Sequence, residues 1–142
     1  MFLRKAPPRN QSGFSLLELL VALVILALIM GLVGPRMLGY LSRAKSQTAS
    51  AQIDNLEGAL DLYLLDVGRY PTEEEGLAAL VESPGAIRTW NGPYLEADEV
   101  PRDPWGEPYR YAMSPEKKKP SVYTLGQDNT EGGEGENADL GL

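Results

Sequence analysis

The C-terminal segment from Leu125 to Leu142 is rich in oxygen-bearing side chains that could bind a cation. Six of them fall within 12 residues: Asp128, Glu131, Glu134, Glu136, Asn137 and Asp139. Three glycines lie among them and leave the backbone free to curl, so several oxygens could face one ion. Calcium accepts about six to eight oxygen ligands and is the metal that such a loop could satisfy, although the spacing is not that of an EF-hand. An acidic, glycine-rich tail is more often disordered, and the composition alone leaves both outcomes open.

A second candidate is Glu18, the one charged residue in the 21-residue apolar stretch from Phe14 to Gly34. A carboxylate inside an apolar helix is costly, and it usually faces a partner or a wet surface. Glu18 could lie near the helix end and reach lipid headgroups, or it could pair with a positive group of another chain. Neither role is catalytic.

The composition excludes several classes of site. The chain has no histidine and no cysteine, so Ser-His-Asp and Cys-His catalysis and a disulfide are impossible, and the commonest zinc ligands are missing. Twenty acidic and 13 basic residues give a formal net charge of −7, which argues against nucleic acid as a partner. No pair of carboxylates stands out in an apolar setting, and we predict that the protein is not an enzyme.

The stretch that carries Glu18 is long enough to cross a membrane. As a helix, residues 14–34 would be roughly 31 Å long, about the hydrocarbon thickness of a bilayer. Residues 1–13 contain three basic residues and no acid, so they are predicted to stay in the cytoplasm while the rest crosses. An ordinary secretory signal has its small-residue cleavage site after the apolar run, whereas here Gly13 precedes it.

Beyond the apolar stretch, the pattern predicts that the same helix continues. Gly34-Pro35 should bend or locally break it, because proline lacks an amide donor and clashes with the preceding turn. The result could be a plain kink or a hinge that lets subunits pack in a filament. Apolar residues then recur at spacings of three and four, which predicts one helix from about Phe14 to Asp66 whose second half packs on a domain. These residues are Ile53, Leu56, Leu60, Tyr63, Leu64 and Val67.

The remaining residues predict an α+β head. Thr72 and Glu75 have the spacing of a capping box ahead of a short helix from about Glu73 to Glu82. The segments 109–113 and 122–125 are rich in strand formers and predict an antiparallel hairpin. A turn-rich loop lies between, and we expect its large apolar residues to anchor it to the long helix in preference to forming a sugar-stacking platform. These residues are Trp90, Tyr94, Leu95 and Trp105.

The run from Gly13 to Glu18, GFSLLE, resembles the class III signal of type IV pilins and type II secretion pseudopilins. The resemblance implies that a prepilin peptidase cuts between Gly13 and Phe14, methylates the new amino group and leaves the apolar helix in the mature chain. It also implies that Glu18 neutralises the Phe14 amine of an adjacent subunit during assembly. Residues 1–13 would be the leader, 14–34 the transmembrane and filament-core helix and 35–142 the head. Loss of the three basic residues in the leader would change the net charge from −7 to −10.

Later stretches are similar to the major pseudopilin of type II secretion systems, and they imply a pilin-like fold. They include GRYPT at 68–72, WNGPYL at 90–95, DPWG at 103–106 and Leu125-Gly126 followed by Asp128. Type IV pilins proper generally close the head with a disulfide, which this chain cannot form. The resemblance implies calcium in the loop after the last strand. The implied ligands are the Leu125 carbonyl and the side chains of Asp128, Asp139, Asn137 and Glu134. Asn129 stands where the family often has glycine.

The resemblance implies a structural subunit that polymerises into a periplasmic filament and helps to export folded proteins across the outer membrane. The expected partners are further copies of the chain, minor pseudopilins, the prepilin peptidase and the inner-membrane assembly platform. The expected location is the bacterial inner membrane, crossed once, with the C-terminal domain in the periplasm. The alternatives are a type IV pilin of a surface fibre used in adhesion, motility or DNA uptake, and a monomeric membrane-anchored module that binds calcium or sugar.

Overall fold

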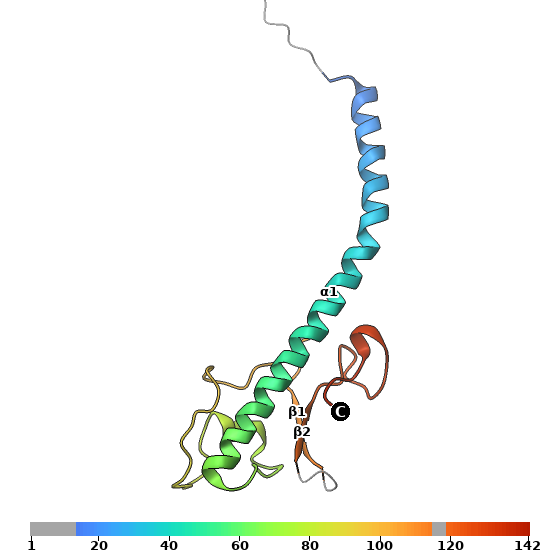
Figure 1. Ribbon diagram of the computed structural model, residues 1–142. Helices are drawn as coiled ribbons and strands as arrows, with labels where there is room; N and C mark the ends of the chain where they lie inside the picture. The colour runs from blue at the N-terminus through green and yellow to red at the C-terminus, as the bar shows by residue number, and fades with distance from the viewer. Residues whose placement is uncertain (1–13, 115–118) are drawn as a thin grey trace, which may run out of the picture. The chain divides into compact units, whose positions relative to one another are not determined.

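The computed structural model describes residues 14–114 and 119–142, and its main element is the helix α1, Leu16–Val67 (Figure 1). The single long helix predicted from about Phe14 to Asp66 is therefore confirmed. The helix ends where Gly68 takes a φ of +81°, a left-handed conformation that side-chain-bearing residues rarely adopt. The Gly68 N–H still donates to the Leu64 carbonyl at 2.8 Å, which closes the last turn.

α1 continues through Gly34 and Pro35 without interruption. Of the two predicted outcomes, a bend or a local break, the break is absent from the single chain. Proline removes one backbone hydrogen bond and adds a clash, but a long helix that is already formed on both sides can continue past one missing bond. A turn that melts when subunits assemble stays a prediction.

The chain divides into two compact units, Met1–Leu38 and Gly39–Leu142. The described part of the first unit is the apolar part of α1. The second unit contains the amphipathic part of α1 and all that follows, and we call it the head from here on.

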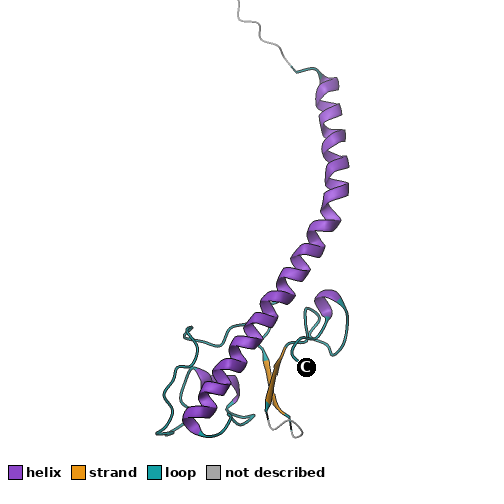
Figure 2. Ribbon diagram, viewed as in Figure 1, coloured by secondary structure: helices purple, strands orange, loops and turns teal. Residues whose placement is uncertain are grey.

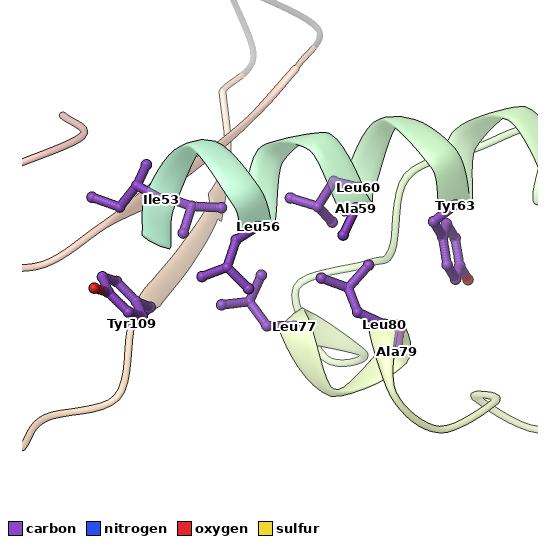
Figure 3. Packing of buried hydrophobic residues seen from close by; sticks show 10 residues of the cluster. Ile53, Leu56, Ala59, Leu60, Tyr63, Leu77, Ala79, Leu80 and Tyr109 are labelled. Carbon is purple, nitrogen blue, oxygen red and sulfur yellow. The ribbon is translucent and has the colours of Figure 1, made fainter. Parts of the chain in front are cut away.

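The core of the head is one apolar cluster between α1 and the segments that follow it (Figure 3). The helix contributes four members of the predicted stripe, Ile53, Leu56, Leu60 and Tyr63, and also Ala59. Of the other two predicted members, Val67 is partly buried against the cluster and Leu64 is not among its residues. The facing residues are Leu77, Ala79, Leu80, Tyr109 and Val122. Burying each large apolar side chain contributes about 1.5–3 kcal/mol, so these contacts hold the segments after residue 67 against the amphipathic part of α1.

The short helix predicted from Glu73 to Glu82 is instead a 3₁₀ helix, η1, Gly76–Leu80. The predicted capping box is confirmed: the Thr72 N–H donates to Glu75 Oε2 at 2.8 Å, and the Glu75 N–H donates to Thr72 Oγ1 at 3.2 Å. Gly76 follows with a φ of +54°, which an α-helix does not contain. The capping turn therefore cannot continue as an α-helix.

The predicted hairpin is confirmed as the strands β1, Arg110–Met113, and β2, Pro120–Tyr123 (Figure 2). They pair antiparallel, with Arg110 opposite Tyr123 and Met113 opposite Pro120. Residues 115–118, between the two strands in the sequence, lie outside the described residues. The hairpin is tied to α1 where the Tyr109 hydroxyl donates to Gln52 Oε1 at 2.6 Å, and burial raises the pKa of Tyr109 to about 12.

The large residues of the 83–108 loop divide into two groups. Trp90, Tyr94 and Leu95 pack against the core cluster, so the predicted anchoring is confirmed for these three. The Tyr94 and Tyr63 rings pack edge to face, with their centroids 5.7 Å apart. Trp105 is not among the residues packed against that cluster: its Nε1 donates to Glu136 Oε2 at 3.4 Å, so it contacts the C-terminal loop. Direct packing of Trp105 on the helix stays a prediction.

Candidate functional site

The first candidate is the apolar part of α1, which is uncovered. From Phe14 to Val33 the large apolar side chains are 45–83% exposed. Among the described residues, α1 is the one helix long and apolar enough to cross a membrane by length and composition. So much exposed apolar surface is unfavourable in water and favourable in lipid or against similar helices.

Glu18 lies in the first turn of α1 and makes a capping box with Ser15. The Glu18 N–H donates to Ser15 Oγ at 3.2 Å, and the Ser15 N–H donates to Glu18 Oε2 at 3.1 Å. Both residues are exposed. The sequence Ser-x-x-Glu contains this signal, but the apolar surroundings of Glu18 drew attention away from it. In the single chain, one oxygen of the Glu18 carboxylate thus accepts a hydrogen bond from the Ser15 backbone N–H of the same chain.

The second candidate is the C-terminal segment 125–139, which forms a closed loop. Thr124 and Leu140 form an antiparallel bridge at its base, with two backbone hydrogen bonds of 3.0 Å each. Inside the loop, the Gln127 N–H donates to the Glu136 carbonyl at 2.8 Å. A Cβ on Gly126 would lie 2.6 Å from the Glu136 carbonyl oxygen, so the two arms of the loop are packed backbone to backbone. The acidic tail therefore has a defined conformation.

The loop turns at Asn129, whose φ is 52°. This left-handed conformation is common for glycine and is tolerated by asparagine better than by most residues. Asn129 is therefore compatible with the left-handed backbone of this turn. Its side-chain oxygen accepts a hydrogen bond from Arg110 Nη2 at 2.9 Å, which links the loop to β1.

The five predicted ligands all lie on this loop. Leu125, the first residue of the loop, is buried. Asp128 is exposed, and its Oδ1 accepts a hydrogen bond from the Thr130 N–H at 3.1 Å. Asn137 lies in the 3₁₀ helix η2, Gly135–Asn137, and its N–H donates to the Glu134 carbonyl at 3.2 Å. Within residues 14–114 and 119–142, no three acidic side chains converge as a ready-made metal cluster.

Asp139 has the environment that best fits a cation. Its Oδ2 accepts from the Gly132 N–H at 2.8 Å, whereas its Oδ1 is buried and has no hydrogen-bond partner among the described residues. A buried carboxylate oxygen without a partner is costly, and a calcium ion would remove that cost. Because calcium accepts carbonyl and amide oxygens as well as carboxylates, a donor set that combines acidic side chains with the Leu125 carbonyl and the Asn137 amide fits calcium.

Asp103 is the functional residue that sequence reasoning missed. It is buried, and its Oδ1 accepts from the Trp105 N–H at 3.0 Å and from the Glu107 N–H at 2.8 Å. Its Oδ2 accepts from the hydroxyl of Thr124, at the base of the loop. One carboxylate therefore joins the 103–107 turn to the loop that contains the predicted ligands. The Asp-Pro-Trp-Gly sequence signals a turn, but nothing in it reveals a partner 21 residues away.

Arg69 and Glu75 form a second contact that spacing did not reveal. The guanidinium donates to both carboxylate oxygens, at 2.6 and 2.8 Å, which fixes the turn between α1 and η1. The hydrogen bond from Arg69, and then those from Thr72, lower the pKa of Glu75 to about 2 against the opposing effect of burial.

This pair predicts an acid-sensitive component of stability. Because the pKa of Glu75 is lower in the folded state than its ordinary value of 4.5, the contribution is complete above pH 4.5 and is lost as the pH falls towards 2. The Arg69 side chain is 44% exposed, so we expect the pair to contribute only about 1–2 kcal/mol to the free energy of unfolding.

Urea unfolding of the full-length chain in micelles at pH 7 and pH 3, followed by tryptophan fluorescence, would measure this contribution. Glu75→Gln should lose most of the difference between the two pH values, and Glu74→Gln should keep it. An equal acid sensitivity in Glu75→Gln and the wild type would contradict the assignment.

Comparison with known proteins decides the family. A family model described as type II secretion system (T2SS), protein G, matches residues 36–142. A second, described as a prokaryotic N-terminal methylation motif, matches residues 8–34. The chain belongs to the type II secretion system protein G family. The predicted resemblance to major pseudopilins is confirmed.

Relatives of this family cover almost the whole chain. Type II secretion system core protein G of Vibrio cholerae is 44% identical over 136 residues, which span 94% of this chain and 92% of the relative. The protein of the same description from Pseudomonas aeruginosa is 41% identical over 138 residues, 94% of this chain and 95% of the relative. The crystal structure of the major pseudopilin from the type 2 secretion system of enterohaemorrhagic Escherichia coli matches with a TM-score of 0.60 and 32% identity. That match covers 75% of this chain and 92% of the solved chain.

Membership of the protein G family assigns the chain a structural role, that of a pseudopilin subunit rather than an enzyme. The match to protein G covers residues 36–142, which include the head, and is separate from the methylation motif at residues 8–34. It therefore favours the pseudopilin over the surface-fibre pilin and over the monomeric module. Gly13 and the rest of the leader lie outside the described residues.

Proposed function

We propose that this chain, after removal of residues 1–13, polymerises through its apolar helix into a periplasmic filament that helps to move folded proteins across the outer membrane. The observation that carries the proposal is the uncovered apolar surface of residues 14–33, joined in one continuous helix to a folded head. In the membrane this surface faces lipid, and in a filament the same surface can face the helices of other copies. The same segment would then anchor the unassembled subunit in the membrane and join the subunits in the filament.

The cysteine-free sequence makes a direct test possible. A chain with Leu20→Cys and Leu28→Cys should form disulfide ladders of several subunits when cells that assemble the filament are oxidised. The control for random collisions is a chain with two exposed head positions changed, Thr89→Cys and Asp98→Cys, and it should give few ladders. Ladders no stronger for the helix pair than for this head pair would refute polymerisation through the helix.

Orientation and location follow from the charges around the helix. The basic leader favours retention on the cytoplasmic side, so a single crossing of the inner membrane would place the head in the periplasm. In that arrangement the expected contacts are further copies of the chain, minor pseudopilins and the inner-membrane assembly platform. The prepilin peptidase would meet the Gly13–Phe14 bond at the cytoplasmic face. The match of the methylation motif to residues 8–34 supports this processing site.

Replacement of Gly13 tests the processing step. We expect Gly13→Val to leave the leader on nearly all chains, because a branched side chain next to the scissile bond would obstruct the peptidase. Intact-mass spectrometry of membrane extracts would then find the precursor and no methylated chain that begins at Phe14. Ser12→Ala, one residue earlier, should be processed normally. Wild-type amounts of mature chain from Gly13→Val would place the cleavage elsewhere.

We also propose that the 125–139 loop binds calcium. The residues that would hold the ion are Asp128, Asp139, Asn137, Glu134 and the carbonyl of Leu125. Two observations support the proposal: the loop is closed at its base, and Asp139 Oδ1 is buried without a partner. The ion would supply positive charge among mutually repelling acids and cross-link the loop in a head that has no disulfide.

Calcium removal should therefore weaken the head. At a calcium concentration 100-fold above the dissociation constant, binding adds about 2.7 kcal/mol to the free energy of unfolding, and EDTA should remove it. Asp128→Ala should lose most of the calcium-dependent rise in melting temperature, whereas Asp98→Ala, an exposed acid outside the loop, should keep it. Limited proteolysis should cut the loop faster without calcium. A wild-type melting temperature that is the same in calcium and in EDTA would refute the site.

A further inference from the structure

The hydroxyl of Thr124, the residue before Leu125, makes two hydrogen bonds. It donates to Asp103 Oδ2 and accepts from the N–H of Gly126 at 3.3 Å. A hydroxyl has one proton, and an ionised carboxylate can only accept. Asp103 therefore determines the direction of the hydroxyl proton and leaves a lone pair free for Gly126.

The hydrogen bond from the Gly126 N–H also fixes the direction of the Leu125 carbonyl. The Gly126 N–H and the Leu125 carbonyl belong to one planar trans peptide group, in which the C=O points opposite to the N–H. Because the N–H points to the Thr124 hydroxyl, the Leu125 carbonyl oxygen must point away from it. No hydrogen bond within the described residues is accepted by this carbonyl.

The other side of the same peptide is also confined. Gly126 is buried with a φ of +67°, and a Cβ there would lie 2.6 Å from the Glu136 carbonyl oxygen and 2.8 Å from the Asn137 carbonyl carbon. The peptide between Leu125 and Gly126 is thus enclosed between the Thr124 side chain and the returning arm of the loop. Its carbonyl has little freedom to rotate.

We propose that Thr124, held by Asp103, is a positioning residue that aims the Leu125 carbonyl oxygen at the calcium ion. Neither side chain is a ligand. Asp103 itself is held by the Trp105 and Glu107 amides, so the 103–107 turn acts as the fixed template for the first ligand of the loop. This inference rests on the proposed calcium site and adds the residues that determine its affinity.

The test is isothermal titration of calcium chloride into the processed full-length chain in detergent micelles, with the calcium-free melting temperature of each variant measured in parallel. Thr124→Val keeps the shape of the side chain and removes the hydroxyl, and we expect calcium affinity to fall at least about 10-fold, as for other groups that orient a ligand. Thr124→Ser restores the hydroxyl and should bind within about 3-fold of the wild type. Thr48→Val, which removes an exposed hydroxyl on α1, should not change the affinity.

Different outcomes separate this inference from the calcium site itself. If Thr124→Val melts earlier yet binds calcium as tightly as the wild type, Thr124 is only structural and the inference is wrong, while the calcium site stands. If the wild type binds no calcium, both are wrong. If Thr124→Val does not fold, Asp103→Asn replaces it. The amide would donate to the Thr124 hydroxyl and compete with Gly126, so affinity should again fall about 10-fold. Wild-type affinity in Asp103→Asn would overturn the inference.

Discussion

Asp103→Ala is expected to lower the free energy of unfolding of the head by about 3 kcal/mol, the largest loss that we expect from any single polar side chain. The substitution leaves the amides of Trp105 and Glu107 and the hydroxyl of Thr124 without their acceptor in a buried site. For a domain of this size the melting temperature should fall by roughly 10–20 °C. Thermal unfolding of the full-length chain in micelles, followed by tryptophan fluorescence in the presence of EDTA, measures the effect without any contribution from bound calcium.

Glu107→Ala is the matched control for this substitution. It removes a neighbouring acidic side chain that is exposed, and it keeps the backbone amide that Asp103 accepts. Its effect should stay within about 0.5 kcal/mol. A loss below about 1 kcal/mol in Asp103→Ala would mean that the turn and the loop do not depend on this carboxylate.

Glu18→Ala is expected to abolish filament formation while leaving processing, membrane insertion and the folded head intact. The proposed partner is the methylated amine of Phe14 on another copy, and an amine left without a counter-charge in an apolar interface costs several kcal/mol. Spread over every subunit contact, a cost of this size should reduce the assembled fraction below detection. Sedimentation of filaments from sheared cells, compared with the total amount of the chain, measures that fraction.

The capping box makes Ser15→Ala the decisive control. This substitution removes the hydroxyl that accepts from the Glu18 amide and leaves the carboxylate in place. Loss of a helix cap costs about 1 kcal/mol, so Ser15→Ala should still assemble, at a reduced level. If Ser15→Ala loses filaments as completely as Glu18→Ala, the carboxylate acts by capping its own helix and not by pairing with a neighbour.

The sequence predicted most of the fold because the main signals are local and repeated. The predicted stripe follows the helical period, and its members Ile53, Leu56, Leu60 and Tyr63 pack in the core. The hairpin followed from strand formers on both sides of a turn. The short helix predicted from Glu73 to Glu82 differs from the observed 3₁₀ helix η1 in both its type and its bounds. A single residue, Gly76, changed that type through its positive φ, which sequence periodicity does not report.

The parts that the sequence did not reveal depend on contacts between distant residues. The bond between Asp103 and Thr124 spans 21 residues, and that between Trp105 and Glu136 spans 31. No spacing rule predicts such pairs, because they depend on how the head folds around α1. The predicted calcium ligands came from resemblance. The structure adds a physical reason for one of them, the unpartnered oxygen of Asp139.

The mass of the chains that make up isolated filaments tests the central claim most directly. If the apolar helix survives processing and joins the subunits, intact-mass spectrometry should find one species that begins at Phe14 and carries one added methyl group. A chain that begins after Gly34 would contradict the account, because the segment proposed to join the copies would be missing from the assembled protein.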